Sequence, residues 1–219
     1  MIKLVIFDLD GTLLDTIGDL AAACDAVLAV RRLPRHTPDG YRRMVGNGIR
    51  RLVERALPEE LRDDATVESV RRDFVDYYID HIDRFTHPYE GIETVVRTIA
   101  DRGIGLAVVS NKFQAGTEKL VHRFFGDTEF VAVFGQREGV PLKPDPCSDL
   151  EIVRLAGVEP SECLHVGDSA VDIATAHAAG VHSVGVTWGF RPRSELVDAG
   201  AEFVVDSPDG LLEVLNSLS

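Results

Sequence analysis

The fold of this chain is decided by one stretch near its start, Lys3-Leu4-Val5-Ile6-Phe7-Asp8-Leu9-Asp10-Gly11-Thr12-Leu13-Leu14. Ile2 and residues 4–7 are apolar without alternation, which predicts a short strand buried on both faces, as in a parallel sheet. Asp8 and Asp10 follow, and side chains two residues apart in an extended chain point the same way. Because ligands bind beyond the carboxyl ends of the strands in open α/β sheets, we expect both carboxylates to face a ligand.

This aspartate pair has two chemical uses. Two neighbouring carboxylates repel each other, so a bound cation such as Mg²⁺ favours the ionised form of both. A carboxylate can also attack phosphorus while a neighbouring group transfers the proton. Gly11 permits a tight turn, and Thr12 adds a hydroxyl and a main-chain N–H. A plain turn is the alternative, and a calcium loop is disfavoured because Leu13 and Asp19 stand where its Gly and Glu would be.

The composition indicates a folded, acidic protein. The chain has 219 residues, of which 45% are hydrophobic, enough for one large domain or a domain with a sizeable insertion. Its formal net charge of -13 argues against a nucleic-acid surface, which needs a basic footprint. Cys24, Cys147 and Cys163 are scattered and odd in number, which favours reduced thiols over a disulfide framework.

We expect a cytoplasmic protein that is a monomer or a homodimer, with neither a membrane nor a nucleic acid as partner. The first strand begins almost at once, without a charged leader, an apolar segment and a cleavage site before it. No apolar run is long enough to span a bilayer.

The chain changes in character after Leu14. Residues 15–84 offer no good strand candidate and show helical patterns, interrupted at Pro34, at Pro58 and at a Gly46-Asn47-Gly48 turn. From residue 85 onward strands alternate with helices, which implies right-handed crossovers and a parallel sheet. We therefore predict an α/β, Rossmann-like core of residues 1–14 and 85–219 with helices on both faces of its sheet, and an all-helical insertion of residues 15–84.

Individual elements are predicted as well. In the core we expect strands at 104–109, 130–134, 163–166, 184–186 and 203–205, and helices at 92–102, 115–124, 148–156, 171–179 and 209–218. In the insertion, Thr66 is expected to cap a long helix, because the apolar positions after it follow helical spacing.

Polar residues lie at or after two further strand ends and on one stiff loop. Ser110 and Asn111 suit donors to phosphate oxygens, although helix capping is the simpler explanation for them in isolation. Lys143 has prolines on both sides, and a rigidly held ammonium can bind phosphate and offset the charge of a nucleophile; an exposed loop lysine is the alternative. Asp168 can ligate a metal, and Asp172 lies one helical turn further on; a helix cap and a surface acid are the alternative.

In this order, the residues resemble the four motifs of the haloacid dehalogenase-like hydrolase superfamily. The matches are Asp8-x-Asp10-Gly11-Thr12, Ser110 with Asn111, Lys143, and Gly167-Asp168 with Asp172. The resemblance covers nearly the whole chain, and residues 15–84 look like the helical cap of that superfamily. Val45-Gly46-Asn47-Gly48 and Ser110-Asn111-Lys112 look most similar to phosphoglycolate phosphatases and their relatives.

The resemblance implies a Mg²⁺-dependent phosphatase that works through an aspartyl-phosphate. Asp8 would attack phosphorus, and Asp10 would protonate the leaving oxygen and then activate water. The implied phosphoryl contacts are Gly11, Thr12, Ser110, Asn111 and Lys143. The implied metal ligands are Asp8, Asp168 and the main-chain carbonyl of Asp10, with Asp172 orienting Lys143 or the outer shell of the metal.

The expected substrate is a small phosphorylated metabolite, with 2-phosphoglycolate as the first candidate. Asp10 argues against a dehalogenase, and the absence of lysine from residues 17–86 argues against a phosphonoacetaldehyde hydrolase that forms a Schiff base. The alternatives are a pyrophosphatase, another sugar-phosphate phosphatase or a mutase of the same superfamily, and, less favoured, a non-catalytic phosphate-binding scaffold. The candidates for substrate contact in the cap are Gly46, Asn47, Gly48 and Arg50.

Overall fold

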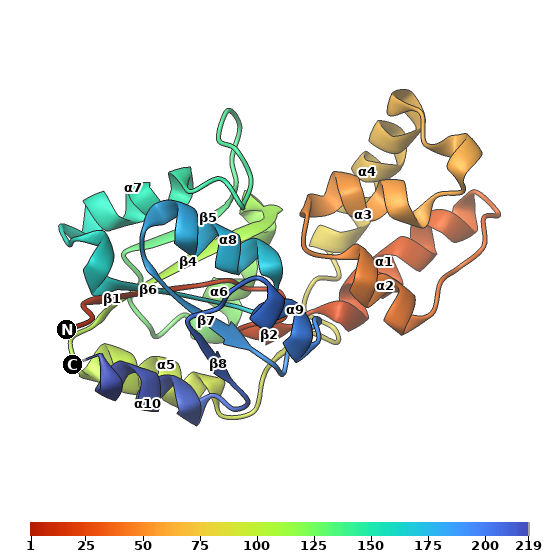
Figure 1. Cartoon of the computed structure of the whole chain (residues 1–219). Coiled ribbons are helices and arrows are strands. Elements are labelled where there is room, and N and C mark those ends of the chain that lie inside the picture. Colours follow the sequence, from red (N-terminus) through yellow and green to blue (C-terminus); the bar gives the residue numbers. More distant parts are fainter. Residues whose placement is uncertain (219) are drawn as a thin grey trace.

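Six parallel strands form the centre of the larger of the two parts of the molecule (Figure 1). The computed structural model describes residues 1–218. In spatial order the strands are β5 (Ala132–Gln136), β4 (Gly105–Phe113), β1 (Leu4–Phe7), β6 (Cys163–Gly167), β7 (His182–Val186) and β8 (Phe203–Val205). Every neighbouring pair is parallel, so the carboxyl ends of all six strands meet at one edge of the sheet. The predicted α/β fold with a parallel sheet is confirmed.

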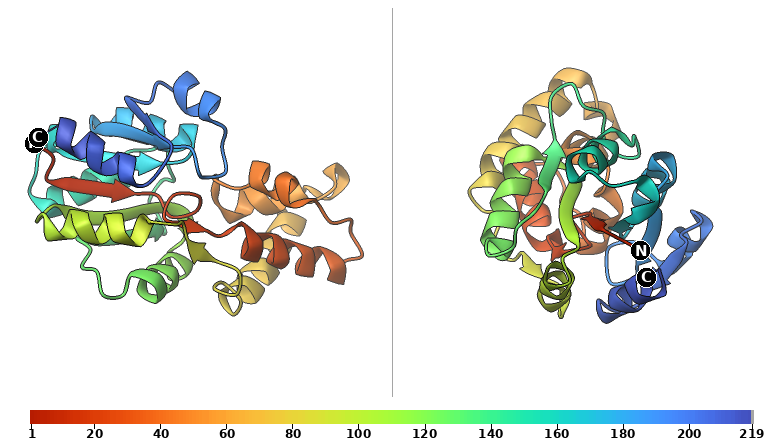
Figure 2. Two further views of the ribbon diagram at one scale, coloured as in Figure 1. Left: turned by 90° about the horizontal axis from the view of Figure 1, so that it is seen from below. Right: turned by 90° about the vertical axis from the view of Figure 1, so that its left-hand side faces the viewer.

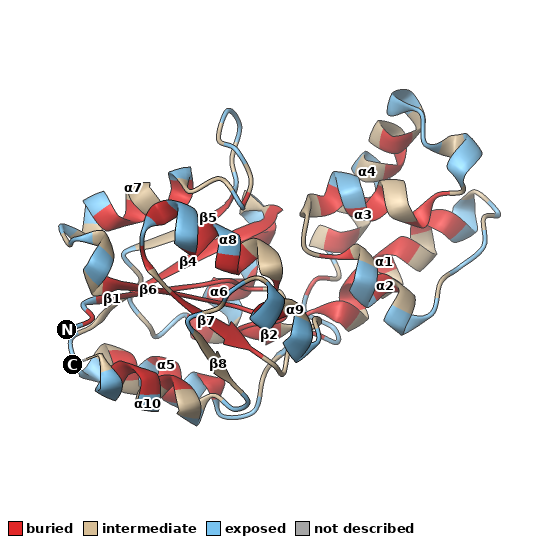
Figure 3. Ribbon diagram, in the orientation of Figure 1, coloured by how far each residue is buried: buried red, intermediate tan, exposed pale blue. Residues whose placement is uncertain are grey.

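The alternating side chains of β1 supply both layers of the core. Val5 and Phe7 pack on one face of the sheet, whereas Leu4 and Ile6 pack on the other. The helices α5 (Ile92–Asp101), α6 (Gln114–Phe125) and α10 (Asp209–Ser217) cover the first face, and α7 (Cys147–Ala156) and α8 (Ala170–Ala179) cover the second (Figures 2 and 3). Full burial of each such side chain contributes about 1.5–3 kcal/mol, which explains why β1 is apolar at every position.

The smaller part of the molecule is the helical cap, which lies beyond the carboxyl edge of the sheet (Figure 1). It consists of α1 (Ile17–Val30), α2 (Pro38–Met44), α3 (Gly48–Ala56) and α4 (Asp64–Ile79), with a short 3₁₀ turn η1 (Glu59–Leu61) before α4. The two connections to the core pair with each other as the antiparallel strands β2 (Leu14–Asp15) and β3 (His87–Pro88). None of the helices in residues 1–218 is long and apolar enough to cross a membrane.

Several elements differ from the predictions. Thr66 does not cap the long helix, because Asp63 accepts a hydrogen bond from the N–H of Thr66 at 3.0 Å and α4 begins at Asp64. β4 continues to Phe113, past the predicted end at Val109. The two-residue strands β2 and β3, the 3₁₀ turn η2 (Pro160–Glu162) and the short helix α9 (Arg193–Asp198) were not predicted, because none is long enough to show a periodic pattern.

Candidate active site

The carboxyl ends of β1, β4 and β6 bring the predicted polar residues together. The last residue of β1 is in register with Val108 of β4 and Val166 of β6. Asp8, Ser110 and Asp168 follow within two residues of these positions, and all three are buried and line one pocket. The parallel register is therefore what places these side chains, which lie far apart in the sequence, beside one another.

Lys143 is buried among the carboxylates of this pocket. Its Nζ donates to Oδ1 of Asp8 at 2.8 Å, to Oδ1 of Asp172 at 2.7 Å and to the main-chain carbonyl of Val109 at 2.8 Å. Burial would lower the pKa of Lys143, but Asp172 and Asp8 together raise it above its ordinary value. Lys143 is therefore a fixed positive charge, and each of its three N–H groups has an acceptor.

One lysine does not neutralise the three buried carboxylates around it. Burial raises the pKa of Asp8 to about 6, although Lys143 acts in the opposite direction. Burial also raises the pKa of Asp168 well above its ordinary value, and Asp172 and Asp8 add to this shift. Burial would likewise raise the pKa of Asp172, but Lys143 and His165 hold it well below its usual range. The pocket therefore has an excess of acceptor groups that are costly to ionise.

The carboxylates form a cluster that fits a divalent cation. Asp8, Asp168 and Asp172 each offer an oxygen, and these oxygens lie within 4.8 Å of one another. An oxygen-only donor set in which the pKa values of Asp8 and Asp168 are raised suits a hard cation such as Mg²⁺. Asp172 is already engaged, because Oδ1 binds Lys143 and Oδ2 accepts from the hydroxyl of Ser169 at 2.7 Å. Asp8 and Asp168 are thus the side chains left to hold a metal.

The loop after β1 leaves room for the Asp168 carboxylate. Gly11 has φ +91°, and a Cβ at this position would lie 2.4 Å from Oδ2 of Asp168. The N–H groups of Gly11 and Thr12 donate to the carbonyls of Leu14 and Leu9 at 2.9 and 3.3 Å. Neither Gly11 nor Thr12 lines the pocket. Gly11 thus has a steric role here, and a direct phosphate contact by either residue stays a prediction.

Asn111 connects Lys143 to the cap. Its Oδ1 accepts the N–H of Lys143 at 2.8 Å, and its Nδ2 donates to the carbonyls of Lys143 at 3.1 Å and Gly46 at 3.0 Å. The helix-capping alternative for Asn111 is wrong, because the N-cap of α6 is Phe113. With both hydrogens of its amide group used, Asn111 positions the Lys143 main chain, and a direct contact with phosphate stays a prediction.

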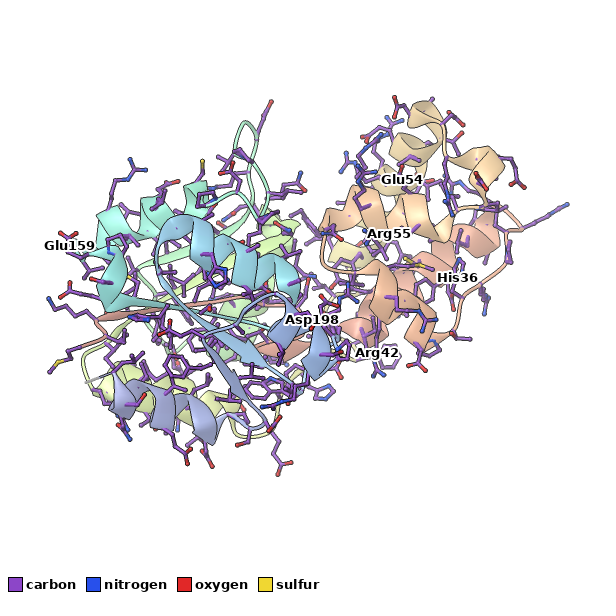
Figure 4. The ribbon with its side chains drawn as sticks, in the orientation of Figure 1. His36, Arg42, Glu54, Arg55, Glu159 and Asp198 are labelled. Carbon is purple, nitrogen blue, oxygen red and sulfur yellow. The ribbon has the colours of Figure 1, made fainter. Side chains whose placement is uncertain are left out.

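Two of the four cap candidates reach the pocket. Gly46 and Gly48 line it, and both have positive φ. Asn47 and Arg50 do not line it. The side-chain oxygen of Asn47 accepts from Arg55 at 2.9 Å, and Arg55 is drawn on α3 in Figure 4. Arg50 forms an ion pair at 2.5 Å with a carboxylate of α4 on the exposed side of the cap.

The space under the cap is small. The cap side of the pocket is formed by the apolar residues Leu20, Val45, Ile49 and Leu52. The cavity measures about 40 Å³. A single water needs about 10–15 Å³ by this kind of measure, so the cavity corresponds to a few water molecules. In this position of the cap, the pocket admits only a small group next to Asp8.

The segment after β7 contributes to the site and was not predicted. The indole N–H of Trp188 donates to the carbonyl of Thr12 at 3.0 Å, and the N–H of Phe190 donates to Oδ2 of Asp168 at 2.5 Å. At Gly189 a Cβ would lie 2.3 Å from the side chain of Asp168. β7 ends at the same edge of the sheet as β1, and this shared position is the signal that could have pointed to residues 188–191.

Arg191 bridges this segment and the cap. Its guanidinium donates to the carbonyl of Arg42 at 2.7 Å and to the carbonyl of Val45 at 2.5 Å. Arg42 lies on α2, at the side of the cap that faces α9 (Figure 4). Arg191 therefore contacts the carbonyl end of α2, where a cation is favoured by the helix dipole.

Comparison with known proteins agrees with this architecture. The family model described as haloacid dehalogenase-like hydrolase matches residues 5–186, which include the pocket residues from Asp8 to Asp172. The chain belongs to the haloacid dehalogenase-like hydrolase family. The resemblance inferred from the sequence is confirmed, and the chain is a phosphoric monoester hydrolase.

Three relatives of this hydrolase are informative. A phosphoglycolate phosphatase of Mesorhizobium japonicum is 37% identical over 192 residues, covering 87% of this chain and 85% of the relative. An N-acetylmuramic acid 6-phosphate phosphatase of Pseudomonas aeruginosa is 34% identical over 217 residues, covering 98% of this chain and 95% of the relative. The crystal structure of a predicted phosphoglycolate phosphatase from Haemophilus somnus superimposes with a TM-score of 0.89 at 27% identity, covering 98% of each chain.

Proposed function

We propose that this hydrolase releases phosphate from a small phosphomonoester, with 2-phosphoglycolate as the first candidate, in a Mg²⁺-dependent reaction through an aspartyl-phosphate at Asp8. The observation that carries the proposal is the position of Lys143, whose Nζ lies 2.8 Å from Asp8 in a small pocket shared with Asp10 and Asp168. A buried carboxylate beside a fixed ammonium is arranged for attack on a phosphoryl group whose charge must be offset.

The reaction has two steps. In the first, a carboxylate oxygen of Asp8 attacks phosphorus, the bond between phosphorus and the ester oxygen breaks, and a proton from Asp10 goes to the leaving oxygen. In the second, Asp10 takes a proton from water, whose oxygen attacks phosphorus and releases the carboxylate of Asp8 and inorganic phosphate. Ser110 and Lys143 contact the transferring phosphoryl group; for this Lys143 turns one N–H from Asp8 to a phosphoryl oxygen, while Asp172 holds it in place.

A bound Mg²⁺ would be held by Asp8, Asp168 and the main-chain carbonyl of Asp10, and would supply positive charge against the phosphoryl oxygens. Four carboxylates and three cationic side chains line the pocket, so a phosphate dianion adds to an existing excess of negative charge. The raised pKa values of Asp8 and Asp168 support the need for a further cation. With Mg²⁺ bound, Asp8 remains the nucleophile and Asp10 remains the acid and base of the two steps.

The relatives support a small substrate. In this position of the cap the cavity of about 40 Å³ has room for only a few water molecules, so the choice of a two-carbon ester rests on the relatives, which include phosphoglycolate phosphatases at 37% and 35% identity. The phosphatase of N-acetylmuramic acid 6-phosphate among the relatives makes that sugar phosphate the competing candidate. We further propose that residues 15–84 act as the mobile cap over a core of residues 1–14 and 85–219.

The proposal places the enzyme in the cytoplasm as a monomer or homodimer, acting on a small phosphorylated metabolite without a membrane or nucleic-acid partner. The net charge of -13 supports this, and so do three cysteines that are all free thiols.

Phosphate release from a substrate panel tests the proposal. The panel contains 2-phosphoglycolate, N-acetylmuramic acid 6-phosphate, pyrophosphate and glucose 1-phosphate, each with Mg²⁺ and with a chelator. We expect Mg²⁺-dependent release, with kcat/KM for 2-phosphoglycolate at least about tenfold above the others; tenfold corresponds to about 1.4 kcal/mol of transition-state binding.

Each other outcome has a defined meaning. Equal or better turnover of N-acetylmuramic acid 6-phosphate or pyrophosphate would contradict the substrate assignment and leave the phosphatase mechanism standing. Interconversion of sugar phosphates without net release would identify a mutase. Release that is the same in the presence of chelator would contradict the role of Mg²⁺.

A further inference from the structure

Lys112 holds one of the two carboxylate oxygens of Asp10. Its Nζ donates to Oδ2 of Asp10 at 2.9 Å. The Lys112 side chain is 2% exposed and that of Asp10 is 13% exposed, so solvent screens this ion pair far less than a surface pair. The pair is separate from the Lys143 cluster, and neither step of the proposed reaction gives Lys112 a role.

Two features fix Lys112 in this position. The register of β4 against β5 shifts between Val109 and Phe113. Neighbouring residues in a regular strand point to opposite faces of the sheet. Here Ser110, Asn111 and Lys112 all line the pocket. A shift of this kind re-aims side chains at the end of a strand. It therefore allows Ser110 and Lys112 to serve the site together with the residue between them.

The second feature comes from the cap. The Nζ of Lys112 lies 4.8 Å from the centroid of the Tyr78 ring, which is a cation–π distance. Tyr78 belongs to α4, is fully buried and contacts the ring of Phe113 at 6.2 Å. The ammonium is thus placed between a core strand and a cap helix, with Asp10 as its carboxylate partner.

The other oxygen of Asp10 remains available. Oδ1 of Asp10 is buried and accepts no hydrogen bond from any of residues 1–218. An acid–base carboxyl group needs one oxygen within hydrogen-bond reach of the atom that receives the proton. With Oδ2 held by Lys112, Oδ1 is the oxygen of Asp10 left without a partner for the leaving oxygen of a bound ester.

We propose that Lys112 is a positioning residue for the acid–base group of this enzyme: it fixes Asp10 so that its second oxygen meets the leaving-group oxygen. The inference rests on the proposed function, because it assigns a residue to the first of its two steps. When the bond between phosphorus and the leaving oxygen breaks, the electron pair stays on that oxygen and the proton carried on Oδ1 of Asp10 joins it, while Oδ2 keeps its hydrogen bond from Lys112. Loss of Lys112 impairs this transfer and leaves the attack by Asp8 in place.

How strongly the loss of activity depends on the leaving group distinguishes this role of Lys112 from a role in substrate binding or in folding. An alkoxide is a poor leaving group and needs the proton, whereas p-nitrophenolate is stable as an anion and does not. A Lys112 that instead bound the carboxylate of the substrate would matter for 2-phosphoglycolate alone. A Lys112 that bound the phosphoryl group or served folding would matter equally for all esters.

The experiment measures kcat/KM with Mg²⁺ for 2-phosphoglycolate, 2-hydroxyethyl phosphate and p-nitrophenyl phosphate. This parameter reports the steps up to formation of the aspartyl-phosphate, so the shared hydrolysis of that intermediate does not enter. We expect Lys112→Met to lose about 100-fold on both alkyl esters and less than about 3-fold on the nitrophenyl ester. Asp10→Asn should show the same pattern, and Lys112→Arg, which keeps the charge, should show a smaller loss of the same kind.

A surface lysine serves as the control for Lys112→Met. Lys3→Met removes a lysine that pairs with Glu162 at the surface, and it should leave all three values unchanged. An equal loss on all three esters in both Lys112→Met and Lys112→Arg would overturn the proposal, as would a loss confined to 2-phosphoglycolate. No release by the wild type from any ester would overturn the proposed function and this role with it.

Discussion

Asp8→Asn is expected to abolish turnover and to make the metal-free protein more stable. The substitution removes the nucleophile, and loss of a nucleophile lowers kcat by about 10⁴-fold or more. It also removes a buried charge. Burial raises the pKa of Asp8 from 3.8 to about 6, so the folded protein carries a charge that its surroundings disfavour. Two pKa units correspond to about 3 kcal/mol, which is the stabilisation expected at neutral pH.

The sign of the pH dependence follows from the direction of this shift. The folded pKa of Asp8 is above its unfolded value, so its ionisation destabilises the fold at pH values above about 6, and this penalty disappears as the pH falls toward 3.8. The unfolding free energies of wild type and Asp8→Asn in chelator should therefore differ most at neutral pH and converge under acid conditions. Denaturant unfolding over this range measures both.

Mg²⁺ should reverse the order of stability of the wild type and Asp8→Asn. A ligand that binds only the folded state stabilises it by RT ln(1 + [L]/Kd), and the variant lacks one of the proposed metal ligands. Added Mg²⁺ should then raise the melting temperature of the wild type and have little effect on Asp8→Asn. A variant that is less stable than the wild type in chelator at neutral pH would contradict the reading of Asp8 as a strained, functional acid.

Lys143→Met is expected to have the largest effect on folding. The substitution leaves the buried carboxylates of Asp8 and Asp172 without their counter-charge, and removing one partner of a buried pair costs about 3–5 kcal/mol. Without Lys143, burial raises the pKa of both acids, so the loss should shrink as the pH falls and they take up protons. Denaturant unfolding at neutral and mildly acid pH measures the effect.

A matched lysine sets the baseline for this experiment. Lys3→Met removes a half-exposed lysine whose ion pair with Glu162 lies at the surface, and it should change the unfolding free energy by less than about 1 kcal/mol. The account of Lys143 would be wrong if the two variants lost the same stability, or if Lys143→Met became less stable on mild acidification.

Much of the core could be predicted from the sequence because its strands are apolar. Val5 and Phe7 could be assigned to a sheet because a run that is apolar at every position needs cover on both faces. The parallel sheet in turn predicted that Asp8 and Asp168 converge, since the carboxyl ends of parallel strands meet at one edge. The elements that escaped prediction, such as β2 and α9, are too short to carry a period and are fixed by tertiary contacts.

The cap side of the site was harder to predict. Arg50 has the charge to bind a substrate carboxylate, but its position on α3 directs it to an ion pair away from the pocket. Lys112 lay outside the strand predicted at 104–109, and the shifted register of β4, which continues to Phe113, places it beside Asp10. Which side of a helix faces the core, and where a strand is irregular, depend on packing that a single sequence does not display.

In the proposed mechanism Asp8 carries the phosphoryl group during turnover. Asp10→Asn allows the most direct test, because p-nitrophenyl phosphate needs no proton for the first step and the variant lacks the base for the second. Mixed with this ester and Mg²⁺ and quenched in acid, the variant should show a peptide containing Asp8 that is heavier by one phosphoryl group in mass spectrometry. A burst of nitrophenolate with no phosphoryl group on that peptide, or with one on another residue, would contradict the account.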